Sequence, residues 1–267
     1  EKIERIGKPL KEWDISMNYG IKTGLNEAFI IDKETRDKLL EEDYKNSEII
    51  KPLLRGKDIE KYNILFADKY LIYIPWHFPN TDNPKSFIEN EKDFENQYSS
   101  VYKYLLKYKD SLSNRNKEET GIRYEWYCLQ RYGSKYYKDF EKEKIIYSEI
   151  VSGPQFYYDN NKIYVEATAF LMTGLNLKYL LANLNSKLIE YTFKTFYAGG
   201  GLGNTGYRYK KVFLEKLPIK PYNNEVELEN KVDLILENNK KLSSYKELLE
   251  NNYKHNDADD SNFYNMY

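Results

Sequence analysis

Apolar and polar positions near the start of the chain follow a pattern that predicts a turn, a strand and a helix in succession. Gly20 and Gly24 bracket the turn, and an apolar strand is expected at 28–31. Asp32 is the expected N-cap of the helix, because aspartate accepts hydrogen bonds from the free N–H groups at a helix start. Apolar residues at 49, 50, 53 and 54 predict a further helical turn that ends at Gly56, a residue typical of helix C-termini. The unit from 17 to 62 is expected to organise the rest of the chain.

The remainder of the chain mixes short apolar strands with amphipathic helices. Strands are expected at 69–74, 144–151, 155–158, 163–173 and 212–217, and helices at 85–95, 98–110, 177–183, 186–196 and 225–251. Strands and helices do not alternate strictly, so the expected fold class is α+β, with a mixed or antiparallel sheet, peripheral helices and a C-terminal helical segment. We expect one domain over 1–221, a spacer or docking helix over 222–254, and a disordered polar tail over 255–267.

Length and composition exclude several classes of protein. The chain has 267 residues, a formal net charge of −1 and a mean hydropathy of −0.80. No run approaches the ~18 apolar residues of a membrane span. The single cysteine, Cys128, allows no internal disulfide and fits a reducing cytoplasm. The chain begins at Glu1 rather than at methionine, which suggests a piece of a longer protein.

Charge is distributed unevenly along the chain. Between 225 and 260 there are ten acidic and five basic residues, whereas between 178 and 220 eight Lys/Arg stand against Glu190 and Glu215. A local cationic surplus of this kind could neutralise several phosphates, although a solvated lysine-rich surface would give the same count.

The motifs of common enzymes are missing or lack their context. Residues 201–206 match the Gly-x-Gly-x-x-Gly pattern of dinucleotide sites, but a helix is expected before them and a strand after them, the reverse of what pyrophosphate binding requires. The chain contains no P-loop sequence and no Asn/Asp-Pro-Pro-Tyr methylase signature, and Glu229-Asn-Lys231 lies in a helical stretch. Cys128 could pair only with His77 or His255, and a buried structural thiol is the favoured interpretation. No catalytic site is expected in this chain.

Two runs combine basic and aromatic residues and are candidate recognition segments. The first contains Arg123, Tyr124, Trp126, Tyr127, Gln130, Arg131, Tyr132 and Lys135, and the second contains Tyr207, Arg208, Tyr209, Lys210 and Lys211. Arginine can bond guanine at two positions, glutamine can do the same to adenine, and aromatic rings contact bases. The alternative is that many of these aromatics belong to the core.

The order of these segments resembles a known family. The chain resembles the TaqI-like C-terminal specificity domain at Gly20-Ile-Lys-Thr-Gly24 with Asn26 to Asp32, at Leu53 to Tyr62, in the helix from Val101, in the strand Glu143 to Ile150 and in the region from Asn183 to Leu217. The resemblance implies a DNA-binding, non-catalytic target recognition module for double-stranded DNA. It also implies a parent protein that is an N6-adenine methyltransferase, which binds S-adenosylmethionine and flips the target adenine, with Mg²⁺ needed only where a nuclease is fused.

With this resemblance, roles can be assigned to individual side chains. We expect Lys22, Thr23, Lys210 and Lys211 to hold phosphates, and Arg123, Arg131 and Arg208, with Gln130 and nearby Trp126, Tyr207 and Lys135, to reach base edges or the adjoining backbone. Arg55 and Asp58 are expected to form an internal salt bridge. Two alternatives stay open: a protein-interaction module that works through the C-terminal helix, and a nucleotide-binding enzyme that uses the glycine loop.

Overall fold

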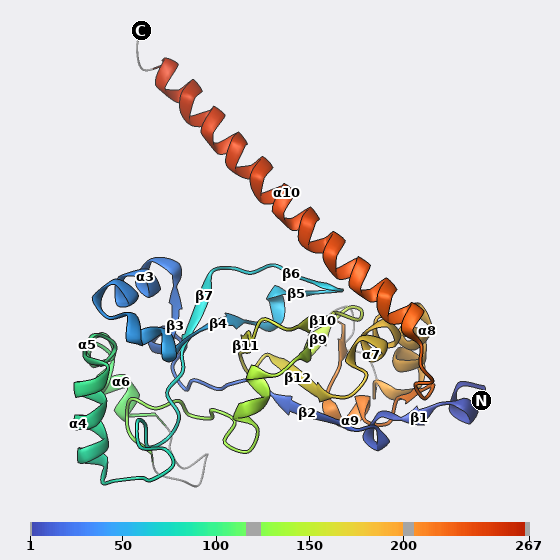
Figure 1. The fold of residues 1–267 in the computed structure, drawn as a ribbon, viewed down its shortest axis with the longest axis horizontal. Coiled ribbons are helices and arrows are strands. Elements are labelled where there is room, and N and C mark those ends of the chain that lie inside the picture. Colours follow the sequence, from blue (N-terminus) through green and yellow to red (C-terminus); the bar gives the residue numbers. More distant parts are fainter. Residues whose placement is uncertain (1, 116–123, 200–205, 265–267) are drawn as a thin grey trace.

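The computed structural model describes residues 2–115, 124–199 and 206–264 and places two four-stranded sheets beside each other (Figure 1). The first sheet has the order β10-β8-β12-β2 and is antiparallel throughout, with β2 at Ile15–Tyr19, β8 at Lys144–Ser148, β10 at Phe156–Asp159 and β12 at Ala169–Gly174. The second has the order β11-β4-β7-β3 and is mixed, with β3 at Ile30–Asp32, β4 at Ile50–Leu54, β7 at Lys69–Ile72 and β11 at Tyr164–Val165. The predicted α+β class is confirmed.

Three two-stranded pairs complete the described strands. β1 (Lys8–Pro9) pairs with β14 (Pro218–Ile219), β5 (Ile59–Glu60) with β6 (Asn63–Ile64), and β9 (Ile150–Val151) with β13 (Tyr207–Arg208). The first of these pairs joins the beginning of the chain to the segment that precedes the long C-terminal helix.

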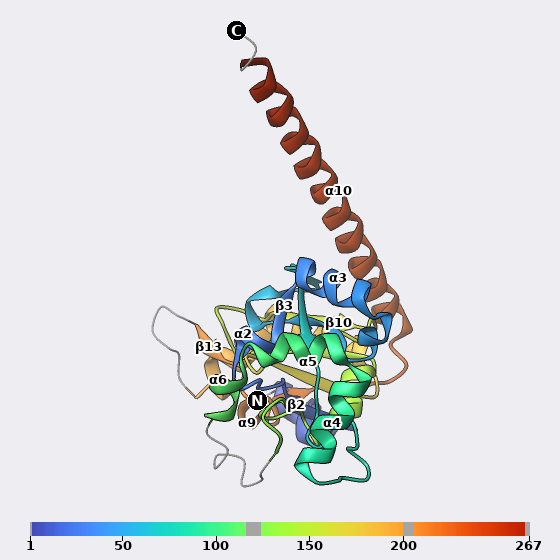
Figure 2. The same ribbon diagram turned by 90° about the vertical axis from the view of Figure 1, so that its left-hand side faces the viewer.

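Helices lie at both ends of the pair of sheets in Figure 1, and Figure 2 looks onto one of these ends. They are α1 (Lys2–Ile6), α2 (Asn26–Phe29), α3 (Lys33–Glu42), α4 (Phe87–Gln97), α5 (Ser99–Leu106), α6 (Lys109–Ser113), α7 (Leu177–Leu184), α8 (Lys187–Thr192) and α9 (Lys211–Leu214). A π-helical turn, Phe193–Tyr197, continues α8. The predicted cap is present, because the Asp32 carboxylate accepts from the Thr35 N–H at 2.9 Å, and this hydrogen bond lowers the pKa of Asp32.

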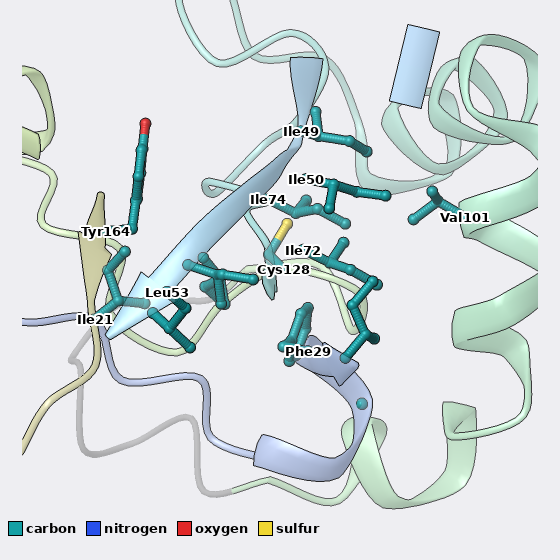
Figure 3. Close-up of a cluster of buried hydrophobic side chains, with 14 of the residues drawn as sticks. Ile21, Phe29, Ile49, Ile50, Leu53, Ile72, Ile74, Val101, Cys128 and Tyr164 are labelled. Carbon is teal, nitrogen blue, oxygen red and sulfur yellow. The ribbon is translucent and has the colours of Figure 1, made fainter. Parts of the chain in front are cut away.

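The first sheet separates two hydrophobic cores because successive side chains of a strand point to opposite faces. In β8, Ile146 packs into one core and Ile145 and Tyr147 into the other. The first core, drawn in Figure 3, lies around the second sheet and includes the fully buried thiol of Cys128. Strands buried on both faces read as continuous apolar runs, which is why the strand at 144–148 could be predicted.

Three local predictions were wrong. Residues 50–54 form strand β4, not a helix that ends at Gly56, because β7 and β11 cover both edges of this apolar segment and Pro52 suits a helix interior poorly. Ala28 and Phe29 lie in the short helix α2, and only Ile30–Asp32 is a strand. The strand expected at 212–217 is instead the helix α9 followed by β14.

The long helix α10, Val226–Tyr264, packs on α7 near its start and then extends away from the sheets (Figure 1). Val232 is buried against α7, and Lys178 pairs with Asp233 at 2.8 Å. Further along, Leu242, Tyr245, Leu248 and Leu249 are each more than half exposed. The helix is longer than predicted and continues into the segment for which disorder was expected; the division at 222 and 255 stays a prediction. Within the described ranges, no helix has the length and apolar character of a membrane span.

Candidate nucleic-acid interface

The turn after β2 joins segments that are far apart in the sequence. The main chain of Lys22 pairs with that of Arg131 in both directions: Lys22 N–H donates to the Arg131 carbonyl at 3.0 Å, and Arg131 N–H donates to the Lys22 carbonyl at 2.9 Å. Gly20 lies against the Glu166 carbonyl, and a Cβ at position 20 would stand 2.2 Å from that oxygen. Only glycine fits this approach. The missing Cβ at Gly20 therefore lets the turn pack directly against the β11–β12 connection.

Thr23 and Arg115 brace the same turn from inside. Thr23 is 2% exposed, and its hydroxyl is bonded to Asn26 Oδ1. The Arg115 guanidinium donates to the carbonyls of Thr23, Trp126 and Cys128 at 2.6–2.7 Å. Burial lowers the pKa of Arg115. Sequence reasoning missed Arg115, because a basic residue in a polar stretch gives no sign that carbonyl oxygens surround it.

Three residues of the predicted contact set belong to the framework. Thr23, Trp126 and Gln130 are at most 8% exposed, so their side chains offer no surface to a ligand, and we withdraw them as contacts. Trp126 Nε1 donates to Glu91 Oε1 at 2.9 Å. Tyr124, Trp126 and Tyr127 of the first basic–aromatic run pack into the first core, whereas Tyr132 is only partly buried. Arg123 lies outside the described residues.

Arg131 and Lys135 remain at the surface. Both are exposed and line a hollow of about 420 Å³ with Trp76, Tyr132, Gly133, Ser134 and Tyr136. We call this the Arg131 hollow. Trp76 and Tyr132, which both line the hollow, meet edge to face with ring centroids 5.4 Å apart.

The second basic–aromatic run lies on β13 and the start of α9. Tyr209 is buried and stacks on Phe193 at 4.3 Å. Its neighbours Arg208 and Lys210 are partly exposed, and their cationic groups lie 3.7 and 3.6 Å from Glu149 Oε1. Tyr207 is half-buried, with Lys194 Nζ 5.1 Å from its ring centroid. Lys211 Nζ lies 3.5 Å from Glu215.

A cleft of about 810 Å³ connects this run to the turn. It is lined by Asn26, Arg55, Gly56, Lys57, Ser148, Glu149, Ile150, Val151, Ser152, Gln155, Glu166, Ala167 and Thr168. Glu149 belongs both to its wall and to the Arg208–Lys210 group, and Asn26 brings the turn to its edge. The structure therefore forms two cationic groups: Lys22 with Arg131 and Lys135 at the turn and the Arg131 hollow, and Arg208 with Lys210 beside Glu149 at the cleft.

The Arg55–Asp58 salt bridge is confirmed and lies at the edge of this cleft. Arg55 Nη2 and Nε donate to the two carboxylate oxygens of Asp58 at 2.8 Å each, and this hydrogen bonding raises the pKa of Arg55. The bidentate pair occupies the guanidinium, which leaves the exposed Lys57 as the cation available at this edge.

The described surroundings of Cys128 are those of a buried structural thiol. Cys128 is fully buried, and burial raises the pKa of its thiol, which disfavours the reactive thiolate. The described residues contain no group of three His, Cys, Asp or Glu side chains arranged to hold a metal ion. Positions 201–205 of the glycine loop lie outside the described residues, and β13 follows Gly206 where a dinucleotide site needs a helix.

Comparison with known proteins gives consistent matches. Residues 51–219 match the model of the TaqI-like C-terminal specificity domain. The type II methyltransferase M.MjaIV of Methanocaldococcus jannaschii is 23% identical over 216 residues, which are 79% of this chain and 66% of that protein.

Two solved structures share the fold. The type IIL restriction–modification enzyme MmeI, solved in complex with DNA, matches with a TM-score of 0.50 and 12% identity over 85% of this chain and 28% of its own. The type IIG restriction endonuclease BpuSI matches with a TM-score of 0.52 and 16% identity over 87% of this chain and 26% of its own. The chain therefore spans only part of the length of each protein that it matches.

Proposed function

The chain belongs to the family of TaqI-like C-terminal specificity domains, and from this we propose that it is the DNA target recognition domain of a restriction–modification protein. The observation that carries the proposal, beside the family match, is the pairing of Lys22 with Arg131. It holds the main chains of two cationic residues next to each other, with Lys135 lining the Arg131 hollow.

The cationic groups suit two different tasks on a duplex. Lysine is a point charge that binds phosphate without reading sequence, whereas the arginine fork can bond both guanine acceptors in the major groove. We assign phosphate contacts to Lys22, Lys135, Lys210 and Lys211, and base reading to Arg131 and Arg208. Arg208 must exchange its 3.7 Å contact with Glu149 for a base, so Glu149 would hold this arginine in place until DNA arrives.

The activity of the whole protein lies, in this proposal, outside the chain. We propose that the parent is an adenine N6-methyltransferase, with or without a nuclease, and that S-adenosylmethionine, and Mg²⁺ where a nuclease is present, bind to those other parts. The exposed apolar residues of α10 would dock on the methyltransferase part. Because the substrate is genomic DNA, we place the protein in the cytoplasm.

Binding to duplex DNA at a series of salt concentrations tests the proposal. Neutralised phosphates release counterions, so log Kd should rise linearly with log salt, with a slope of about 0.9 for each phosphate contact. Lys240→Ala on the acidic helix α10 is the matched control and should leave the slope unchanged. A binding constant that does not respond to salt, or stabilisation by free nucleotides instead of DNA, would contradict the assignment.

A further inference from the structure

A second cavity, of about 440 Å³, adjoins the Arg131 hollow. Its lining consists of Tyr73, Pro75, Phe78, Pro79, Asn80, Thr81, Asp82, Asn83, Tyr132 and Tyr137. We call it the tyrosine pocket. Three tyrosines and a phenylalanine give it aromatic walls, and its volume falls within the ~300–1,000 Å³ typical of small-ligand pockets. Tyr132 belongs to both this pocket and the Arg131 hollow, so the two depressions share a wall.

Tyr73 and Phe78 in the wall of the tyrosine pocket are held by contacts behind them. The Tyr73 hydroxyl donates to the Tyr132 carbonyl at 3.3 Å, and the Tyr127 hydroxyl donates to the Phe78 carbonyl at 2.9 Å. Phe78 packs on Tyr98 with ring centroids 5.3 Å apart. Side chains locked in this way lose little freedom when a planar ligand enters, because the cost of ordering them is already met in the free protein.

The loop that carries the pocket is held in an unusual conformation. His77 has a φ of 62°, which a residue with a side chain adopts at a cost. Glu125, only 3% exposed, accepts hydrogen bonds from the His77 N–H at 2.9 Å and from Asn90 Nδ2 at 2.8 Å, and it also contacts the His77 ring and the Cys128 thiol. A buried carboxylate thus holds the strained loop, and strain that the surrounding structure maintains is typical of ligand sites.

Two polar side chains at the rim of the tyrosine pocket take no part in holding the described fold together. Within the described ranges, the side chains of Asp82 and Asn83 make no hydrogen bond or ion pair, and both are exposed. A carboxylate repels phosphates, so Asp82 would not contact the DNA backbone. Carboxylates accept hydrogen bonds from the amino group of cytosine, and adenine carries the same kind of donor.

We propose that the tyrosine pocket receives one unpaired base of the bound DNA, an adenine or a cytosine. This inference rests on the proposed DNA recognition. The base stacks against Tyr132 and Tyr137, its exocyclic amino group donates to the Asp82 carboxylate, and Lys135 holds an adjoining phosphate. Stacking on aromatic side chains strengthens the binding of a base that enters, because every base has a π-face.

The test compares duplexes that differ by one extrahelical nucleotide. Taking a base out of the stack costs least where it has no partner, so a single bulged base exposes the pocket's preference without the full cost of unpairing. The affinities of the full chain are measured for a matched duplex and for duplexes with a bulged adenine, cytosine or thymine. We expect bulged adenine and cytosine to bind about tenfold more tightly than the matched duplex, and thymine to gain less.

Two variants distinguish binding of a base in the tyrosine pocket from a general preference for flexible DNA. Tyr137→Ala should remove the preference for every bulge and leave matched-duplex binding intact, whereas Asp82→Ala should remove only the preference for adenine and cytosine over thymine. Tyr137 is 42% exposed, so its truncation is not expected to unfold the chain, and Tyr44→Ala at a side chain that is 79% exposed is the control.

The outcomes test the proposal for the tyrosine pocket separately from the proposed DNA recognition. Salt-dependent binding of all duplexes with equal affinity would overturn the pocket and leave the recognition function standing. Preference for bulges that survives Tyr137→Ala, or free adenosine competing as well as bulged DNA, would also overturn it. Failure to bind any DNA would overturn both proposals.

Discussion

The main chains of Lys22 and Arg131 are hydrogen-bonded to each other at 3.0 and 2.9 Å, although the two residues stand in different halves of the domain sequence. The pairing continues the edge at which Ile21 joins the β11–β12 connection. Arg115 then fixes both segments by donating to the Thr23 and Cys128 carbonyls. Two candidate DNA contacts are therefore positioned by backbone rather than by flexible side-chain packing, which is the precision that base recognition requires.

The close approach at Gly20 should be essential to this arrangement. A Cβ at Gly20 would stand 2.2 Å from a backbone oxygen, whereas the nearest atom to one at Gly153 is a glutamate side-chain oxygen at 3.2 Å. Gly20→Ala should destabilise the fold by about 1–3 kcal/mol through forced displacement of the turn. Gly153→Ala is the matched control and should change the free energy of unfolding in urea far less. Equal effects of the two substitutions would contradict this account of the turn.

Lys210 should act on all DNA sequences alike. Because it is assigned to a phosphate, Lys210→Ala should weaken cognate and random duplexes equally and reduce the salt slope by about one. Fluorescence anisotropy over a range of salt concentrations measures both quantities. A loss confined to one DNA sequence would instead assign Lys210 to base reading.

Removing one member of the fully buried pair of Lys144 and Asp159 should strongly destabilise the chain. Lys144 Nζ lies against Asp159 Oδ2 and also donates to the Phe140 carbonyl at 2.8 Å, while the Asp159 carboxylate accepts from the Ile163 N–H at 2.9 Å. Burial lowers the pKa of Lys144, against the effect of the neighbouring carboxylate. Lys144→Met leaves a buried carboxylate without its cation and should cost about 3–5 kcal/mol.

A double-mutant cycle checks this assignment by urea unfolding. Lys144→Met combined with Asp159→Asn should be less destabilised than the sum of the single variants, because the second substitution removes the uncompensated charge. Strict additivity would show that the two groups do not act as a pair.

Glu91 should make stability depend on pH at the acidic end. Burial acts to raise the pKa of Glu91, but hydrogen bonds from Trp126, Lys109 and Tyr102 outweigh it, and the pKa is lowered from 4.5. A carboxyl with a lowered folded pKa stabilises the fold above its unfolded value, and this contribution is lost as the pH falls through the folded pKa. Glu91→Gln should therefore cost about 1–3 kcal/mol at pH 7 and progressively less below pH 4.5.

Urea unfolding of wild type and Glu91→Gln at pH 7 and pH 3 measures this difference. Glu95→Gln, at an exposed position of the same helix, is the control. A Glu91→Gln cost that stays constant across this range would contradict the role given to the ionised carboxylate.

The sequence predicted those parts of the structure that local chemistry decides. The apolar run from Lys144, the Asp32 cap and the Arg55–Asp58 pair depend on neighbours in the chain, and all three are present. Residues 50–54 were assigned to the wrong element because their spacing fits a helix, and only pairing with β7 and β11 decides otherwise.

The candidate site shows the same division between local and tertiary information. Arg131 and Lys135 were found as part of a basic–aromatic run, but the run could not reveal that Trp126 and Gln130 face the core. Arg115 went unnoticed because its carbonyl partners come from distant segments. Burial depends on the tertiary structure. Composition can therefore identify the basic–aromatic segment, but not which of its side chains reach the surface.

Selection from a pool of random duplexes, carried out with wild type and with Arg131→Ala, tests the central claim most directly. If Arg131 reads a base edge from its fixed place beside Lys22, the wild type should enrich one sequence motif. The variant should then enrich the same motif with one position relaxed, by about 1–3 kcal/mol of lost discrimination. An unenriched wild-type pool, or an unchanged motif for Arg131→Ala, would contradict the account.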